Sequence, residues 1–354
     1  MSKPSTATLE DFANLVRQGY TPLELLEITE LGIPSMDRYL RWCREDNLLP
    51  RNITITGNRF TTGEVPAYPR EVDKPIPLDG FDTQDMLEHL STLGYLIVPP
   101  ERQTDRLVQI RLQPWSHDWY AFGVVSDTHM GSRFQQLTHL HSAYDLFAEE
   151  GINTVLHAGD ISDGQHVYRG HEYELFVHGA TAQSKYIAKR YPHREGITTH
   201  FIAGNHDDDH WKRAGVDIGE MIALRRDDLV YEGLYGAKVS INGCLDVYLH
   251  HPDGGVAYAR SYKPQKMVEQ FAPGEKPRML IQGHYHTGCT LPMYRNVFAM
   301  MVACFQAQTP YLKRKGLYPE VGFNIVQFVP DGEGGVQRIR QEFMPFFVPK
   351  EDDY

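Results

Sequence analysis

Five apolar segments of the chain each end in a group of polar side chains of the kinds that bind metal ions. The segments are Phe122–Ser126, Thr154–His157, Thr199–Ala203, Leu245–His250 and Met279–Gln282. The polar groups are Asp127-Thr-His129, Gly159-Asp160-Ile-Ser-Asp163-Gly164, Gly204-Asn205-His206-Asp207, His250-His251-Pro252 and Gly283-His284-Tyr-His286. Helical patterns separate the early segments, and this alternation predicts an α/β layered core. Because ligand sites in such folds gather at the carboxyl ends of strands, we expect these polar groups to form one site.

The donor chemistry of these groups favours divalent metal ions. Asp, His and Asn side chains without a thiolate suit Mn, Fe, Zn, Co or Ni, and Mn is our first expectation. About seven potential ligands exceed what one ion needs, so two ions that share a carboxylate, roughly 3.5–4 Å apart, are predicted. The glycines before Asp160, Asn205 and His284 are expected to allow the tight turns that aim these ligands inward.

In chain order the groups read DxH, GDxxD, GNHD, a later His and GHxH, from Asp127 to His286. In this order they resemble the calcineurin-like metallophosphoesterase superfamily, over about residues 120–345. The resemblance implies an α/β fold, namely a four-layer metallophosphoesterase β-sandwich flanked by helices. It also implies an enzyme, a metal-dependent phosphoesterase.

The resemblance implies a role for each matched position. Asp160 would bridge the two ions, and the full ligand set would be Asp127, His129, Asp160, Asn205, His250, His284 and His286. His206 would contact the phosphate and protonate the leaving oxygen, and the adjacent Asp207 would orient its ring. A hydroxide that bridges the ions would attack phosphorus in line.

Two positions near these motifs stay open from the sequence. Either His250 or His251 can be the ligand. We favour His250 because the family's histidine usually stands two places before a proline, which leaves His251 as a flanking substrate contact. Asp163 is interpreted as structural rather than as a ligand, because it lies a turn beyond the loop that carries Asp160.

The first part of the chain has a different pattern. Apolar residues at helical spacing predict three short helices, over residues 9–16, 23–28 and 36–43. The segment 53–62 predicts a hairpin, so residues 1–63 are interpreted as a winged helix-turn-helix module. Residues 64–115 are interpreted as a linker with an accessory helix and hairpin, and residues 116–354 as the catalytic domain. A helix over Thr83–Leu93, followed by Tyr95–Val98 and Arg106–Leu112, is either half of a second winged module or an accessory layer on the main domain.

Nucleic-acid binding is one function for the N-terminal module, through Arg38, Arg41 and Arg44 on its third predicted helix. The alternative is packing on the catalytic domain or on a second copy of the chain in a homo-oligomer.

Three features favour nucleic acid as the substrate. The motif Asp127-Thr-His129-Met-Gly131 resembles the opening of the SbcD-type nucleases. A winged module precedes the catalytic domain, and basic residues gather on that module and at Lys313-Arg314-Lys315. Arg169, which follows the second polar group, is a further candidate for substrate contact. The chain departs from those nucleases in its long N-terminal prefix.

We therefore predict a phosphodiesterase or nuclease that hydrolyses DNA or RNA. The alternative is a phosphodiesterase or phosphatase for a small substrate, such as a cyclic nucleotide or a phosphomonoester. A binding protein with an inactive site is a third interpretation, which the complete set of ligand types disfavours.

Composition limits the partners of the chain. With 35 basic and 46 acidic residues the net charge is −11, so nucleic-acid contact requires a local basic patch or bound cations. The longest apolar run, Val297–Phe305, is too short to cross a bilayer, and the N-terminus lacks a secretory signal. Four cysteines without a CxxC pair fit reduced thiols. We therefore expect a cytoplasmic protein without a membrane partner.

Overall fold

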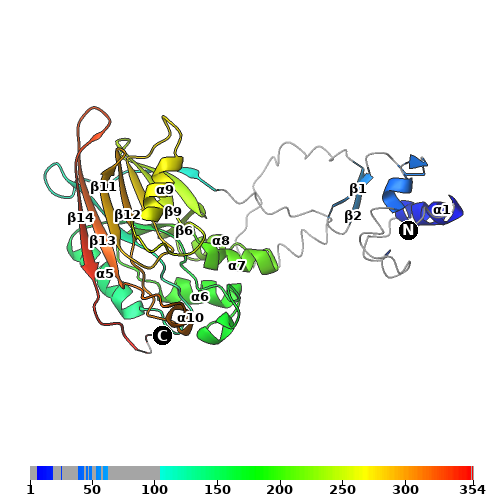
Figure 1. The fold of residues 1–354 in the computed structure, drawn as a ribbon, viewed down its shortest axis with the longest axis horizontal. Helices are drawn as coiled ribbons and strands as arrows, with labels where there is room; N and C mark the ends of the chain where they lie inside the picture. The colour runs from blue at the N-terminus through cyan, green and yellow to red at the C-terminus, as the bar shows by residue number, and fades with distance from the viewer. Residues whose placement is uncertain are drawn as a thin grey trace. The chain divides into compact units, whose positions relative to one another are not determined.

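The computed structural model describes residues 6–18, 25, 39–43, 45–46, 48–49, 53–56, 59–62, 104–351 and 353. The chain divides into two compact units, Met1–Ile97 and Val98–Tyr354. Figure 1 shows the labelled helices and strands of both units. Among the described residues, no helix has the length and apolar character needed to cross a membrane.

The smaller unit contains helix α1 (Thr6–Arg17) and a hairpin of β1 (Ile53–Thr56) and β2 (Arg59–Thr62). Its buried residues are Leu9, Phe12, Ala13, Val16, Leu25, Leu40, Cys43 and Leu49. The first predicted helix and the two arms of the predicted hairpin are thus present. Residues 39–43 of the third predicted helix are helical, whereas only residue 25 of the second is described. Residues 64–103 lie outside the described residues, so the winged-helix interpretation stays a prediction.

The larger unit contains two six-stranded sheets, and the first has the order β14-β13-β4-β5-β6-β7. Its strands are β4 (Tyr120–Val125), β5 (Thr154–His157), β6 (Thr198–Ala203), β7 (Leu229–Leu234), β13 (Gly322–Pro330) and β14 (Val336–Pro345). Strands β4 to β7 run parallel, and β13 and β14 extend the sheet in antiparallel pairing. The carboxyl ends of β4, β5 and β6 therefore lie at one edge.

The second sheet has the order β11-β12-β10-β9-β8-β3. Its strands are β3 (Arg106–Ile110), β8 (Gly236–Ile241), β9 (Leu245–His250), β10 (Met279–Gln282), β11 (Cys289–Tyr294) and β12 (Val297–Met301). Strands β9, β10 and β12 are parallel, so the ends of β9 and β10 also lie side by side.

Strand β3 places the last segment of the stretch left open by the sequence. It pairs in parallel with β8, from Arg106 opposite Ala237 to Ile110 opposite Ile241. The segment is therefore an edge strand of the large sandwich and not part of a second winged module. The larger unit accordingly includes residues before 116.

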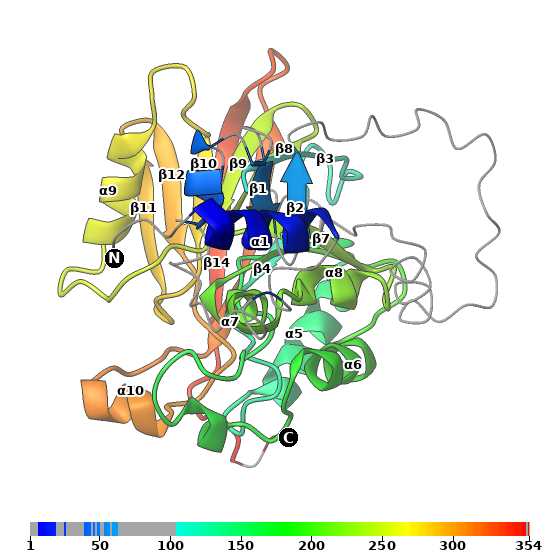
Figure 2. The ribbon, with the colours of Figure 1, turned by 90° about the vertical axis from the view of Figure 1, so that its right-hand side faces the viewer.

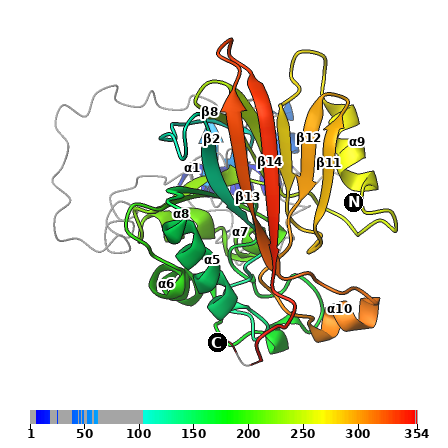
Figure 3. The ribbon, with the colours of Figure 1, turned by 90° about the vertical axis from the view of Figure 1, so that its left-hand side faces the viewer.

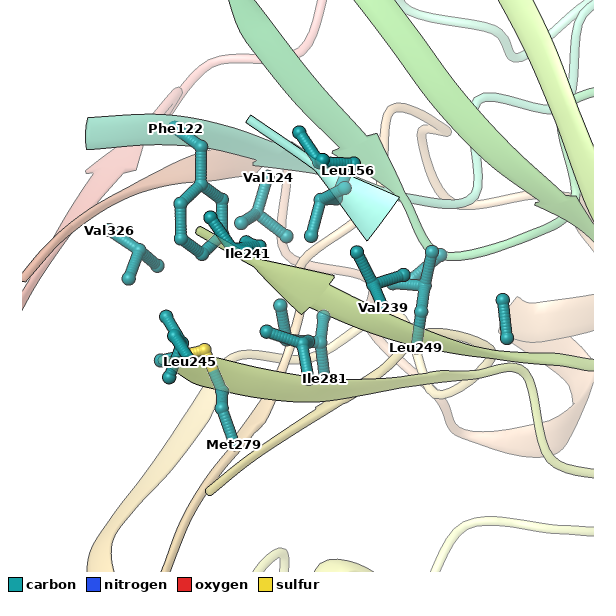
Figure 4. Close-up of a cluster of buried hydrophobic side chains, with 14 of the residues drawn as sticks. Phe122, Val124, Leu156, Val239, Ile241, Leu245, Leu249, Met279, Ile281 and Val326 are labelled. Atoms are coloured by element: carbon teal, nitrogen blue, oxygen red, sulfur yellow. The ribbon is translucent and has the colours of Figure 1, made fainter. Parts of the chain in front are cut away.

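The core lies between the two sheets, as Figure 4 shows. Phe122, Val124 and Leu156 of the first sheet face Val239 and Leu249 of the second, and all five are buried. Because successive side chains of a strand point to opposite faces, Ala121 and Val125 of β4 lie on the outer face of the first sheet.

Helices cover the outer faces of both sheets. Helices α5 (Leu137–Glu149), α6 (Ala180–Arg190) and α8 (Ile218–Ala223) pack on the first sheet, and α9 (Tyr262–Gln270) packs on the second. Figure 3 shows the first three helices on one side of the strands and α9 on the other. The predicted four-layer metallophosphoesterase architecture is thus confirmed.

Three short elements lie among the loops of this unit. They are η1 (His171–Glu174), α7 (Asn205–Ala214) and α10 (Pro310–Lys315). Helix α7 begins directly after Gly204 at the end of β6. Figure 2 shows α10 apart from α5 and α6, at the end of the unit that also holds loops of the site.

Candidate active site

The polar groups that follow the five strands come together. The backbone N–H of Asp127, after β4, donates to the carbonyl of Gly159, after β5, at 2.9 Å. The N–H of His284, after β10 in the other sheet, donates to Oδ2 of Asp127 at 2.9 Å. The predicted convergence of strand ends is therefore present, and it joins the two sheets.

The first ligand cluster consists of Asp127, His129, Asp160 and His286. Nε2 of His129 lies 3.0 Å from Nε2 of His286, which is 3.3 Å from Oδ1 of Asp127. Nε2 of His129 is also 3.9 Å from Oδ1 of Asp127 and from Oδ2 of Asp160. One donor atom from each of these four residues thus lies at the edge of the same small volume.

The second ligand cluster consists of Asp160, Asn205, His251 and His284. Nε2 of His251 lies 3.1 Å from Oδ2 of Asp160 and 3.2 Å from Oδ1 of Asn205. His284 completes the group, and because its Nε2 bonds the carbonyl of Gly254 at 2.7 Å, its Nδ1 is the available nitrogen. Asp160 belongs to both clusters, as expected for a carboxylate that bridges two ions.

The charge balance of the clusters fits divalent cations. Asp127 and Asp160 are almost fully buried, and within residues 104–351 they form ion pairs only with histidines. Burial acts to raise the pKa of the Asp160 carboxyl, but the charges of His251 and His206 outweigh it, and the pKa lies well below its ordinary value. Two ionised carboxylates beside imidazole nitrogens only 3.0 Å apart are the donor set of a metal site.

The backbone at the ligands is strained. Five of them have φ in the left-handed region, namely Asp127 (51°), His129 (42°), Asp160 (55°), His284 (77°) and His286 (53°). Such a conformation costs of order 1–3 kcal/mol per residue and persists only where the surroundings enforce it. The hydrogen bonds between the turns provide that enforcement, so the ligands are held in place before any ion binds.

The glycines beside the ligands act in two ways. Gly159 has φ of 96°, which is the tight turn that the sequence predicts. Gly204 has φ of −107°, and there the reason is space, because a Cβ would collide with Oδ1 of Asp160. A Cβ on Gly283 would lie 2.9 Å from Oδ2 of Asp127 and would collide with backbone as well.

His206 lies beside the first cluster. Its Nδ1 lies 2.8 Å from the carbonyl oxygen of Asp163 and 3.2 Å from the Asp163 carboxylate. This leaves Nε2 for a ligand in the cleft that His206 lines. Burial acts to lower the pKa of His206, but the negative charges of Asp160 and Asp163 prevail and raise the pKa to about 9.

The contacts of Asp207 differ from the role predicted for it. Its carboxylate accepts hydrogen bonds from the N–H and Oγ of Ser162, at 2.8 and 2.6 Å, and from the N–H of Gly204 at 2.9 Å. Asp207 therefore ties the turn after β6 to the turn after β5, and it does not hold the ring of His206. The residue beside Nδ1 of His206 is instead Asp163, which the sequence analysis interprets as structural.

The structure brings His251 rather than His250, the residue preferred from the sequence, to the second ligand cluster. Both lie at the end of β9, where successive side chains point to opposite faces. His250 stacks on Tyr248, with ring centroids 5.2 Å apart, and its Nδ1 bonds Nε2 of Gln282. His251 is fully buried in the second ligand cluster, so it is not a flanking substrate contact either.

A cleft of about 550 Å³ opens over both ligand clusters. Asn205, His206 and His284 line it, together with the loops 253–260 and 309–319. Lys313, Arg314 and Lys315 are exposed on α10, beside this cleft, whereas Arg169 is exposed next to the lining residue Tyr168. Tyr258, Tyr311 and Tyr318 in these two segments belong to no motif, so sequence reasoning had no signal by which to find them.

Comparison with known proteins supports the assignment of this site. Residues 120–288 match the family model of the calcineurin-like phosphoesterases. The chain contains a calcineurin-like phosphoesterase domain. That family comprises metal-dependent phosphoesterases, and the match ends just after His286, a residue of the first ligand cluster.

One curated relative is the DNA polymerase II small subunit of Archaeoglobus fulgidus, 26% identical over 255 residues. The match covers 59% of this chain, and the chain spans about half of the relative, 51% of its length. Similar solved structures include Vacuolar Protein Sorting 29 of Cryptosporidium parvum, at 12% identity and a TM-score of 0.33, and Vps29 of Chaetomium thermophilum, at 13% identity and a TM-score of 0.35. The match to the Cryptosporidium structure covers 64% of this chain and 97% of that chain. The match to the Chaetomium structure covers 65% of this chain and 98% of that chain.

Proposed function

We propose that this chain is a dimetal phosphodiesterase that hydrolyses DNA or RNA. The observation that carries the proposal is the sharing of Asp160 between two ligand clusters at the floor of one cleft. A similar protein is a DNA polymerase subunit, which supports nucleic acid as the substrate class.

The two ions would be held by the two clusters, with His251 in the place first given to His250. When bound, such a pair supplies a nucleophile at neutral pH and neutralises phosphate charge. We propose Mn²⁺ as the ion, because the donors are imidazole, carboxylate and amide groups without a thiolate.

His206 would then act on the substrate itself. Its Nδ1 is engaged by Asp163, so Nε2 is the atom that contacts a phosphate oxygen and gives a proton to the leaving oxygen. The raised pKa of about 9 keeps the imidazole protonated at neutral pH in the metal-free chain, as a proton donor requires.

The test is hydrolysis in Mn²⁺ of labelled single-stranded DNA, duplex DNA and RNA, beside bis-p-nitrophenyl phosphate. We expect cleavage of nucleic acid that is lost in the variant His206→Ala, which retains both ions. The variant Asp160→Ala should lose metal as well. Cleavage of the small diester alone would favour the small-substrate alternative, and no turnover of any substrate would indicate a binding protein.

The N-terminal unit would recruit the substrate. Arg41 is exposed on its surface, whereas Arg38 and Arg44 lie outside the described residues. Replacing all three arginines by alanine should weaken nucleic-acid binding and leave hydrolysis of bis-p-nitrophenyl phosphate intact. Unchanged binding would favour the alternative in which this unit contacts a second copy of the chain.

A further inference from the structure

The cleft over the ligand clusters is rich in tyrosine. Tyr168, Tyr258, Tyr285, Tyr311 and Tyr318 all line it. Three of them are engaged within the protein. Tyr168 and Tyr311 stack with ring centroids 4.0 Å apart and an interplanar angle of 16°, and Tyr285 is 7% exposed.

The other two tyrosines are open to solvent. Tyr258 is fully exposed, and Tyr318 is 68% exposed. They stand on different walls, since Tyr258 lies in the loop between β9 and α9 and Tyr318 follows α10. Large exposed aromatic rings at a cleft mark a surface that contacts a ligand.

Basic side chains stand beside these rings. Lys313, Arg314 and Lys315 are exposed on α10, between the lining residues Tyr311 and Tyr318, and Nζ of Lys315 lies 5.8 Å from the centre of the Tyr311 ring. The other charges along the cleft are mixed, since Arg260 pairs with Glu320 at 2.6 Å and Asp253 is also present. Positive charge at the cleft is thus provided by α10 and by Lys263 of α9, whose Nζ lies 5.7 Å from the centre of the Tyr285 ring.

Proteins that bind single-stranded nucleic acid combine aromatic rings with basic side chains. The rings stack on the bases, and the basic side chains contact the phosphates. In a duplex the base faces are already stacked, so tyrosines have no face to contact. We propose that this cleft binds single-stranded nucleic acid, with bases beside the reacting phosphate stacked on Tyr258 and Tyr318 and phosphates contacting Lys313, Arg314 and Lys315.

The proposal deepens the proposed function and rests on it for the reacting phosphate, but binding can be measured without turnover. The full chain, in the His206→Ala background with Mn²⁺, is titrated into a labelled DNA strand, an RNA strand, a duplex, and a DNA strand with abasic sites. Fluorescence anisotropy gives each dissociation constant.

Tyr258→Leu and Tyr318→Leu should each weaken binding of the intact strands about tenfold, the size expected for loss of one stacked base. The same variants should leave binding of the abasic strand unchanged, because no ring–base contact is present to lose. Tyr258→Phe and Tyr318→Phe retain a ring and should bind as the parent does. Tyr173→Leu is the matched control, an exposed tyrosine on η1 that does not line the cleft.

A loss of equal size on the abasic strand or the duplex, or no loss on any strand, would overturn the inference. The wild-type chain assayed for cleavage in Mn²⁺ tests the proposed function separately. Base-dependent binding without cleavage overturns the nuclease proposal and supports the binding site. Cleavage without base-dependent binding supports the nuclease proposal and overturns the inferred binding site.

Discussion

Nδ1 of His129 lies 2.8 Å from Oδ1 of Asp163, a carboxylate outside the two ligand clusters that share Asp160. Because Nδ1 donates this hydrogen bond, the tautomer leaves the Nε2 lone pair for a metal ion. The same carboxylate lies 3.2 Å from Nδ1 of His206. One buried aspartate therefore fixes the ring of a proposed ligand and the ring of the proposed proton donor.

Replacing Asp163 by asparagine should weaken Mn²⁺ binding about 10- to 100-fold, because an amide no longer fixes both imidazole rings as a carboxylate does. Isothermal titration with Mn²⁺ measures the change. Asp145→Asn is the control, since Asp145 pairs with Arg194 on the surface and is 55% exposed. An unchanged affinity in Asp163→Asn would show that the rings are held by other contacts.

The adjacent histidines at the end of β9 offer a matched pair of variants. His251→Ala should remove the second ion, because His251 is the nitrogen donor nearest to Asp160 and Asn205 in the second ligand cluster. His250→Ala should retain two ions, since His250 contacts Tyr248 and Gln282 instead. Metal content per chain after gel filtration decides between them, and loss of an ion from His250→Ala would restore the interpretation made from the sequence.

The order of the motifs was enough to predict the sandwich and the meeting of the strand ends. The preference for His250 rests on counting residues back from Pro252, a spacing that does not say which face of β9 a side chain occupies. In the structure His250 is the last residue of β9, paired with Gln282. The next residue, His251, lies in the turn that leads into the site. Side-chain direction at a strand end depends on register, which one sequence does not reveal.

The role predicted for Asp207 rests on adjacency in sequence in the same way. Consecutive residues at the start of a helix point in directions about 100° apart, so Asp207 and His206 do not face each other. The residue that holds His206 is Asp163, which is distant in sequence and comes near through the pairing of the turns. Tyr258 and Tyr318 of the cleft lie in irregular segments without periodicity, so their approach to the site follows from tertiary packing alone.

Gly204→Ala should damage the site although the substitution adds one methyl group. The Cβ would collide with Oδ1 of Asp160 and lie 2.7 Å from the ring of His251, both buried and fixed by hydrogen bonds. We expect a loss of about 1–3 kcal/mol in unfolding free energy, typical of an overpacked core, together with weaker Mn²⁺ binding. Denaturant unfolding measures the first effect. Gly255→Ala is the control, because a Cβ there meets no atom within 4 Å, and equal stability of the two variants would contradict the geometry.

The metal-free chain should lose stability as pH rises from about 6.5 to about 9. Burial acts to lower the pKa of His206 and of His251, but the charge of Asp160 prevails and raises each pKa to about 9, from an ordinary value of 6.5. A group whose pKa is raised on folding stabilises the fold fully below its unfolded pKa, and this stabilisation is lost as pH rises through the folded pKa.

The Tm measured in EDTA should therefore fall across this range, and the fall should be smaller in His251→Ala. His250→Ala should keep the full slope, because burial lowers the pKa of His250 to about 4 and the ring is neutral throughout. In Mn²⁺ the trend should reverse, since protons compete with the ion for the same imidazoles and binding strengthens as pH rises. A Tm in EDTA that is flat or rises between these pH values would mean that His206 and His251 are not protonated beside Asp160.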